Sequence, residues 1–510
     1  MSRVKFVRVA GCLVVAVAAT CGALTARASK PAGEATGESG GAINGRYVNP
    51  LSIEGTRSAA DPTIVRWHDK YYMYLTGGMV WVSDDLITWK HEQAAMPAGQ
   101  RSPTAPNFFE YNGSVYLSGN STGLYKASNP LGPWTYLGDL KDASRKTMRL
   151  FDQMTFVDTD NRVYMYYSGM HTNGIWGVEL DRKDLTHFVG EPVRMFTFDP
   201  SHKWERYGDN NEGTHVSWLE APWMTKHNGR YYLQYSAPGT EWKTYSVGVY
   251  TGSHPLGPFT CAPRNPMLVH HNGLIAGTGH HSVVEGPGGR LWAFYTILFR
   301  NWSTFDRRIG MDPVDFDSQG NMYVDGPSEE PRKVLDPTAP DASIAVSINR
   351  YTYAASSAAP GRDPQYAFDN NVRTWWQPAE GDAKPWLVLD LGSRNADDPN
   401  QEFMIDSSRV IFDSAPHLPP GEIHVDGHDR KWFDQPPGAP GPYQYRLEAS
   451  LDGKQYWTVV DRTANDHIAT IEFDNFKPVR CRFVRLTVTG IPPGAPLAVL
   501  EFTVFGKSAE

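Results

Sequence analysis

Residues 61–74 read Asp61-Pro-Thr-Ile-Val-Arg-Trp-His-Asp-Lys-Tyr-Tyr-Met-Tyr, and this layout recurs four more times along the chain. Each copy combines a short strand pattern, a turn and a second strand rich in aromatic residues. The further copies start at Ala105, Asp152, Glu220 and His280. Turns such as Asn112-Gly113 accept positive φ and favour hairpins. Repeats with this spacing leave room for a four-stranded blade, so residues 46–325 are predicted to form a five-bladed β-propeller in an all-β protein.

Polar side chains stand at the start of these repeats. Asp152, Glu220 and His280 each lie ten positions before the basic residue that follows the turn, and Asp61 lies nine before Lys70. Because the inner strands of a propeller all start at one end of its axis, these four side chains are predicted to meet in one pocket. The second repeat breaks the pattern and offers Asn107 or Thr104 instead.

Converging carboxylates suit the hydrolysis of a glycosidic bond. One acid protonates the leaving oxygen while another activates water, and crowded negative charges raise the pKa of at least one of them. A single acid at a strand start is more often a turn cap. Three acids at the matching position of three different repeats favour a functional site. His280 is either a hydrogen-bonded packing residue or a residue beside an axial water or cation.

These motifs carry a resemblance to a known family. Ala60-Asp61-Pro62-Thr63, Phe151-Asp152-Gln153, Glu220-Ala221-Pro222-Trp223 and Gly279-His280-His281-Ser282 occur in the order seen in glycoside hydrolase family 43. That resemblance implies hydrolysis with inversion, with Asp61 as general base, Glu220 as general acid and Asp152 orienting Glu220 and keeping its pKa raised. It also implies a calcium ion on the axis near His280.

The candidate substrate-binding residues are Asn107, Trp223 and His280. Two departures from the family pattern are Gln153, where Pro is usual, and Asn107, where an Asp is common; the second leaves the sugar specificity open. The polar stretch 204–212 is predicted to be a solvated insertion, with a loop at the pocket rim as the alternative.

A second strand-rich region follows a Pro-rich linker at 326–342. Residues 343–510 resemble the discoidin, or coagulation-factor type C, β-sandwich of family 32 carbohydrate-binding modules, and 394–440 are predicted to be an insertion in it. The resemblance implies a structural calcium site at Asp369, Thr374 and Glu501; a turn held by Asx hydrogen bonds is the alternative.

Composition and the chain start bound the remaining possibilities. Arg3, Lys5 and Arg8, an apolar run and an Ala26-Arg27-Ala28 site predict a signal peptide at 1–28 and a flexible leader at 29–45, hence a secreted or periplasmic protein with no membrane span after cleavage. A net charge of −8 does not favour nucleic acid as a partner. Cys261 and Cys481 are expected to be unpaired, and no organic cofactor is predicted.

The sequence therefore predicts a glycosidase that removes terminal or side-chain sugars from a plant-type polysaccharide. An α-L-arabinofuranosidase or β-xylosidase is the main hypothesis, and a β-galactofuranosidase or galactan-active enzyme is the alternative. A non-catalytic, lectin-like propeller is the alternative from another class. The oligomeric state and the choice between exo and endo action stay open.

Overall fold

The computed structural model describes residues 45–53, 59–299, 305–335, 343–348, 353–394, 400–413 and 441–509, and these are almost entirely β-structure. The predicted signal peptide, and the leader up to residue 44, lie outside the described residues. The described helices are short 3₁₀ turns: η1 (His171–Asn173), η2 (Lys203–Glu205), η3 (Pro287–Gly289), η4 (Pro364–Ala367) and η5 (Leu391–Arg394). None of them is long and apolar enough to cross a membrane.

Five antiparallel sheets, each built from consecutive strands, follow one another from Thr63 to Val324. Their strands are β2 (Thr63–Trp67), β3 (Lys70–Leu75), β4 (Met79–Ser83) and β5 (Lys90–Glu92); β6 (Asn107–Tyr111), β7 (Ser114–Ser118), β8 (Leu124–Ala127) and β9 (Thr135–Gly138); β10 (Phe151–Val157), β11 (Val163–Ser168), β12 (Ile175–Asp181) and β13 (Asp184–Phe196); β14 (Glu220–His227), β15 (Arg230–Ala237), β16 (Ser246–Gly252), β17 (Phe259–Cys261) and β18 (Leu268–Val269); and β19 (Gly279–Glu285), β20 (Leu291–Leu298), β21 (Arg307–Phe316) and β22 (Met322–Val324).

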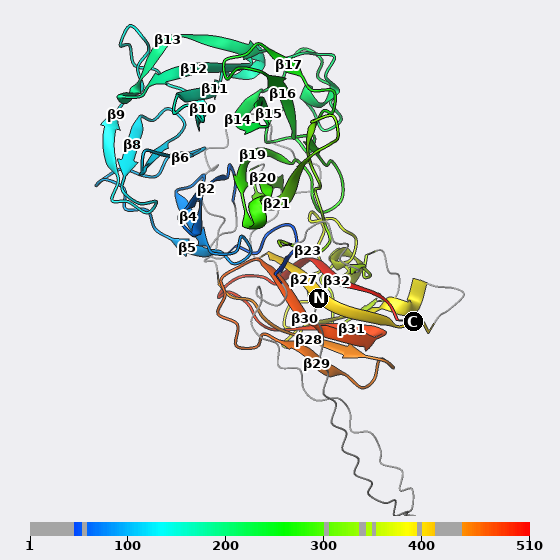
Figure 1. Ribbon diagram of the computed structural model, residues 1–510. Coiled ribbons are helices and arrows are strands. Elements are labelled where there is room, and N and C mark those ends of the chain that lie inside the picture. Colours follow the sequence, from blue (N-terminus) through cyan, green and yellow to red (C-terminus); the bar gives the residue numbers. More distant parts are fainter. Residues whose placement is uncertain are drawn as a thin grey trace, which may run out of the picture. The chain divides into compact units, whose positions relative to one another are not determined.

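The first strand of each sheet contacts the first strands of its two neighbours, and β19 of the fifth sheet contacts β2 of the first. Figure 1 shows the sheets radiating from a common centre, with these first strands nearest to it. Each blade uses only consecutive strands, so the fifth blade meets the first through packing and side-chain contacts and not through a shared sheet. The predicted five-bladed propeller is confirmed.

Aromatic residues of the repeats fill the gaps between blades. One hydrophobic cluster lies between each pair of neighbours: Trp81 of the first blade, for example, packs with Trp292 of the fifth, and Tyr166 of the third with Tyr235 of the fourth. Large rings bury 150–250 Å² each and dominate such cores. The aromatic strand of each repeat is therefore the part of the sequence that holds the blades together.

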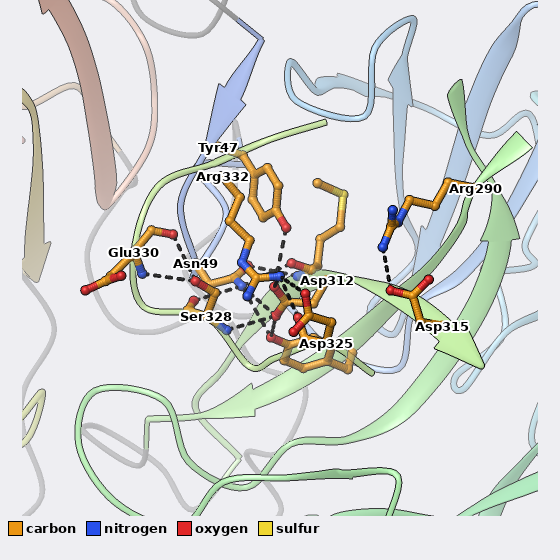
Figure 2. Close-up of polar contacts among 11 residues, drawn as sticks. Tyr47, Asn49, Arg290, Asp312, Asp315, Asp325, Ser328, Glu330 and Arg332 are labelled. Carbon is orange, nitrogen blue, oxygen red and sulfur yellow. Dashed lines mark hydrogen bonds and ion pairs between the residues drawn. The ribbon is translucent and has the colours of Figure 1, made fainter. Parts of the chain in front are cut away.

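The segment before the first blade is fastened to the fifth blade. Strand β1 (Arg46–Tyr47) pairs with β23 (Arg332–Lys333), so the predicted linker contains a short strand that its Pro-rich sequence did not indicate. Asp312 of β21 accepts hydrogen bonds from Asn49, at 3.0 Å, and from Tyr295, at 2.7 Å, and Tyr47 points to it as well (Figure 2). This buried carboxyl group therefore links the N-terminal segment to the fifth blade.

Two further sheets follow from Ile344 to Ser508 and share one hydrophobic core, which makes this region the predicted β-sandwich. The first has the order β24 (Ile344–Ala345), β32 (Ala498–Ser508), β27 (Phe403–Asp413), β30 (Ile471–Cys481). The second has the order β25 (Tyr353–Ala355), β26 (Trp386–Asp390), β31 (Phe483–Gly490), β28 (Gln444–Ser450), β29 (Trp457–Asp461). Cys261 and Cys481 are free, as predicted.

The prediction of an insertion across 394–440 is wrong for residues Phe403–Asp413. Strand β27 lies there, between β32 and β30 in the centre of its sheet, with buried residues over most of its length. The sequence predicted an insertion here because Pro-rich and acidic segments flank this strand on both sides of its apolar pattern. Residues 395–399 and 414–440 lie outside the described residues.

We expect the buried Asp312 to make stability depend on pH. Burial raises the pKa of Asp312 to about 7, so the folded protein binds a proton there that the unfolded chain has lost above about pH 4. Stability from this group therefore falls as pH rises from about 4 to 7, with a slope of at most about 1.4 kcal/mol per pH unit. Between pH 4 and 7 the melting temperature of the wild type should therefore fall relative to that of Asp312→Asn.

Asp315→Asn is the control for removing one negative charge from the same strand, because Asp315 lies nearby and pairs with Arg290 (Figure 2). A difference in melting temperature between wild type and Asp312→Asn that stays constant or grows with pH would contradict the expectation.

Candidate active site

The chain enters each inner strand through one residue in the left-handed conformation. These residues are Asp61 (φ 58°), Ala105 (φ 43°), Asp152 (φ 48°), Ala221 (φ 49°) and His280 (φ 40°). A non-glycine residue pays of order 1 kcal/mol for such a backbone, so a fivefold repetition is a constraint of the blade design. Three of the four predicted site residues occupy this position, at one end of the ring.

Glu220 is the exception, and the predicted register is wrong by one residue there. The inner strands of the third, fourth and fifth blades share a β-bulge, between Phe151 and Met154, Glu220 and Trp223, and Gly279 and Ser282. Glu220 therefore corresponds to Phe151 and Gly279, one position before Asp152 and His280. The count from the basic residue failed because the hairpin of the fourth blade has a shorter turn, where His227 pairs directly with Arg230.

Each entry is fastened to the preceding blade by a side chain at the end of that blade's second strand, a contact we call the inter-blade clamp. The backbone N–H groups of Ala105, Asp152, His280 and Asp61 donate to Thr76 (2.8 Å), Asn120 (2.6 Å), Ser236 (2.8 Å) and Thr296 (3.1 Å). In the third blade Ser168 donates instead to the carbonyl of Leu219, at 2.6 Å. The clamp between Thr296 and Asp61 joins the fifth blade to the first.

Asp61 is a buried carboxylate with several donors around it. Arg307 lies 3.1 Å from Oδ1, Nδ1 of His280 lies 3.2 Å from the same oxygen, and the hydroxyl of Thr76 donates to Oδ2 at 2.6 Å. Burial by itself raises the pKa of Asp61, but these three groups outweigh it and hold the pKa below its usual value. Asp61 is therefore ionised near neutral pH, as a general base must be.

Glu220 has the opposite environment. It is only 6% exposed, and burial, followed by the charge of Asp152, raises its pKa well above the usual value. Asp152 accepts a hydrogen bond from the backbone of Ala221, next to Glu220, and lies 3.6 Å from Nδ1 of His280. The structure thus brings all three predicted catalytic carboxylates together and pushes the pKa values of Asp61 and Glu220 apart, the arrangement that separates a base from an acid.

Tyr245 orients Glu220. Its buried hydroxyl donates to Oε1 of Glu220 at 2.6 Å and restricts rotation of the carboxyl group. The ring reaches this place because Gly279 has no side chain: a Cβ there would lie 2.3 Å from the tyrosine ring. The Gly279-His280 pair therefore provides both space for Tyr245 and a histidine between Asp61 and Asp152.

The remaining predicted substrate-binding residues lie along the axis. Asn107 donates to Ser118 and Thr155 and accepts the backbone N–H of Thr155, so its amide serves contacts within the protein. Trp223 is half-buried and lines a cavity of about 20 Å³ together with Asn107, Asp152 and His280. A space of this size holds about one water molecule. The geometry favours a substrate contact for neither Asn107 nor Trp223, and for both it stays a prediction.

The residues predicted to bind calcium in the sandwich lie close together, and they also form the predicted turn. Asp369 accepts hydrogen bonds from Asn371 (3.1 Å) and Thr374 (2.7 Å). Glu501 accepts one from the backbone of Asn370 at 2.9 Å, while its buried Oε1 has no hydrogen-bond partner within the described structure. Over the ranges described above, no group of three or more His, Cys, Asp or Glu side chains is placed to hold a metal ion.

The stretch 204–212 is not the solvated insertion that was favoured. Glu205 is fully buried, Trp204 donates to Tyr235 at 3.2 Å, and Asp209 accepts the backbone N–H of Lys243 at 2.9 Å. The rings of Tyr207 and Trp242 lie 5.8 Å apart. Burial and the charges of Glu241 and Glu220 raise the pKa of Tyr207, which puts this loop near the general-acid candidate.

The sequence analysis missed Thr76, Arg307, Tyr245 and Thr296. A signal for the two threonines exists, because a polar residue ends the second strand of every repeat: Thr76, Asn120, Ser168, Ser236 and Thr296. Arg307 and Tyr245 carry no such signal, since Arg307 begins β21 and Tyr245 precedes β16, both outside the repeated hairpins.

A comparison with protein-family models matches residues 49–322 to the model described as glycosyl hydrolases family 43. The chain belongs to family 43 of the glycosyl hydrolases. It is therefore a glycoside hydrolase, and the family-43 region coincides with the five blades and their carboxylates.

Several characterised proteins resemble this family-43 chain at low identity. The β-D-galactofuranosidase xynD of Aspergillus niger is 27% identical over 297 residues, which cover 52% of this chain and 81% of that protein. The β-xylosidase of Xylanibacter ruminicola is 26% identical over 241 residues, covering 42% and 67%. A crystal structure of a thermostable family-43 glycoside hydrolase is 26% identical, with a TM-score of 0.48, and covers 56% of this chain and 98% of that one.

We expect Asp152→Asn to move the alkaline limb of the pH profile. Glu220 must be protonated to act as an acid, and activity falls as pH rises through its pKa. Removing the charge of Asp152 lowers that pKa, so the alkaline limb of kcat/KM should shift to lower pH. Asp158→Asn is the matched control, because Asp158 follows the same inner strand but pairs with Lys226. The alkaline limb of kcat/KM of this variant should match that of the wild type.

Proposed function

We propose that this enzyme is an inverting glycosidase that releases terminal or side-chain sugars from plant-type polysaccharide, most simply an α-L-arabinofuranosidase or β-xylosidase. The observation that carries the proposal is the opposite charge environment of two buried carboxyl groups at one end of the propeller. Arg307, His280 and Thr76 keep Asp61 ionised, while burial and Asp152 keep Glu220 protonated. In this mechanism Asp61 deprotonates the attacking water and Glu220 protonates the leaving oxygen.

The choice of sugar rests on the relatives. Proteins named β-xylosidase and xylosidase/arabinosidase support the main proposal. The similarity to a protein named β-D-galactofuranosidase supports that activity as the second candidate. A lectin-like propeller is the weaker alternative, because a binding protein has no need for two carboxyl groups held in opposite protonation states.

The roles of Glu220 and Asp61 can be separated by the leaving group. p-Nitrophenyl α-L-arabinofuranoside, β-D-xyloside and β-D-galactofuranoside identify the sugar first, and NMR of the product follows its configuration. On the best sugar, Glu220→Ala should lose roughly 10²–10⁴-fold in kcat with a poor leaving group and much less with p-nitrophenol, which needs no proton. Asp61→Ala should lose activity with both. Retained configuration, or equal losses of Glu220→Ala on both leaving groups, would contradict the mechanism.

For residues 343–510 we propose a discoidin-like module of the carbohydrate-binding type, joined to the propeller through the segment 326–342. Export through the signal peptide at 1–28 would bring both regions to an extracellular or periplasmic polysaccharide. Support comes from the motifs of the second region and from its two sheets around one core.

The module is also proposed to hold a structural calcium ion at Asp369 and Glu501, with Thr374 supporting the loop. The unpartnered, fully buried Oε1 of Glu501 and the nearby carboxyl group of Asp369 are hard oxygen donors of the kind that Ca²⁺ prefers. An axial calcium near His280 has less support. Nδ1 of that histidine faces two carboxylates, and the cavity beside it measures about 20 Å³.

Calcium binding should be visible as a change in stability. We expect CaCl₂ to raise the melting temperature of the EDTA-treated full chain, because a ligand that binds only the folded state stabilises it by mass action. MgCl₂ at the same concentration is the control for ionic strength. Glu501→Gln should lose the calcium-dependent rise; a wild type that melts at the same temperature with and without Ca²⁺ would rule the site out.

A further inference from the structure

Thr76 makes two hydrogen bonds of opposite direction, one with the backbone of the second blade and one with the carboxyl group of Asp61. Its hydroxyl accepts the backbone N–H of Ala105 at 2.8 Å, which fastens the second blade. The same hydroxyl donates its single proton to Oδ2 of Asp61 at 2.6 Å. Thr76 is 7% exposed, so both bonds lie inside the protein. One buried side chain thereby links the entry of the second blade to the carboxyl group of the first.

The donors around Asp61 are divided unequally between its two oxygens. Oδ1 meets Arg307 at 3.1 Å and Nδ1 of His280 at 3.2 Å. Oδ2 meets the hydroxyl of Thr76. An ionised carboxylate offers about four lone-pair positions, two on each oxygen. Oδ1 is thus contacted by both Arg307 and His280, whereas Thr76 is the one contact of Oδ2 among the described residues, and a lone-pair position of Oδ2 is left to accept a proton.

We propose that Oδ2 of Asp61 is the atom that takes the proton from the attacking water, and that Thr76 is the positioning residue that keeps this oxygen turned to the water. The proposal deepens the function proposed above and rests on Asp61 acting as general base. As the water oxygen bonds to the anomeric carbon, its O–H bond breaks and the proton passes to Oδ2. The glycosidic C–O bond breaks at the same time, and the leaving oxygen takes the proton of Glu220.

The direction of the Thr76 bond suits this role. A hydroxyl that donates to Oδ2 prevents the carboxyl group from rotating, and its proton favours the ionised form of Asp61. Without this bond Asp61 could rotate and turn the open lone-pair position of Oδ2 away from the water. A mispositioned reacting group of this kind costs on the order of 100-fold in rate.

The test compares Thr76→Val, which keeps the shape but loses the hydroxyl, with Thr76→Ser, which keeps the hydroxyl. On an aryl glycoside that the wild type hydrolyses, Thr76→Val should lose roughly 10- to 100-fold in kcat with little change in KM. The acid limb of kcat/KM should move to higher pH, because Asp61 loses a bond that favours its charge. Thr76→Ser should have the wild-type kcat and the wild-type acid limb. If Thr76→Val melts at a much lower temperature than the wild type, Thr76→Ala is used in its place, because it loses the same hydroxyl.

Thr296→Val is the matched control for a purely structural effect. It removes the clamp on the backbone N–H of Asp61 and leaves the carboxyl group with all its donors. This variant should keep the wild-type acid limb. A Thr76→Val enzyme with an unchanged acid limb, or with the same kcat and pH profile as Thr296→Val, would overturn the assignment of Oδ2.

Asp61→Ala separates this proposal from the one on which it rests. If Asp61→Ala is inactive while Thr76→Val behaves as the wild type, Asp61 remains the base and only the role of Thr76 is refuted. If Asp61→Ala itself hydrolyses the substrate at the wild-type rate, the general-base function fails, and with it the assignment of Oδ2.

Discussion

Three carboxyl groups are buried together at one end of the propeller, and the chemistry depends on how unequally they are compensated. Arg307 is paired with Asp61, and His280 lies between Asp61 and Asp152. Glu220 meets instead the hydroxyl of Tyr245 and the negative charge of Asp152. Like charges that share a buried space resist joint ionisation, so the proton stays on the group with the least positive surroundings. Arg307, His280 and Thr76 thereby favour Asp61 as the proposed base, while burial beside Asp152 favours Glu220 as the proposed proton donor.

The blades make this arrangement possible because they fix the backbone as well as the side chains. Every inner strand begins with a left-handed residue, and four of these residues are held by a side chain of the preceding blade. Such a backbone costs free energy in the absence of support. The clamps and the aromatic clusters between blades provide that support, so a functional side chain can occupy a strained position without loosening the ring. Ala105 and Ala221 show that the position itself is structural, since neither has a functional group.

The ring also depends on contacts outside the repeated hairpins. The N-terminal segment is fastened through Tyr47 and Asn49 to Asp312, and through β1 to β23. Arg307, the partner of Asp61, lies on the same strand as Asp312. Strand β21 of the fifth blade therefore connects the anchoring of the chain start to Asp61, the proposed general base, although neither contact is visible in the repeated hairpin of that blade.

The amino-acid sequence by itself determined the five hairpins, the all-β class, the family and the three acids, because turn residues, alternation and strand starts are local patterns. Only the tertiary structure decided which donors meet each acid: Arg307 reaches Asp61 across 246 positions, and Tyr245 reaches Glu220 from the residue before β16. The one-residue offset of Glu220 and the central place of β27 also required three dimensions, since bulges and sheet order follow from packing between distant segments. The bonds made by Arg307 and Tyr245 follow no repeat in the sequence, and the electrostatics of this site depend on them.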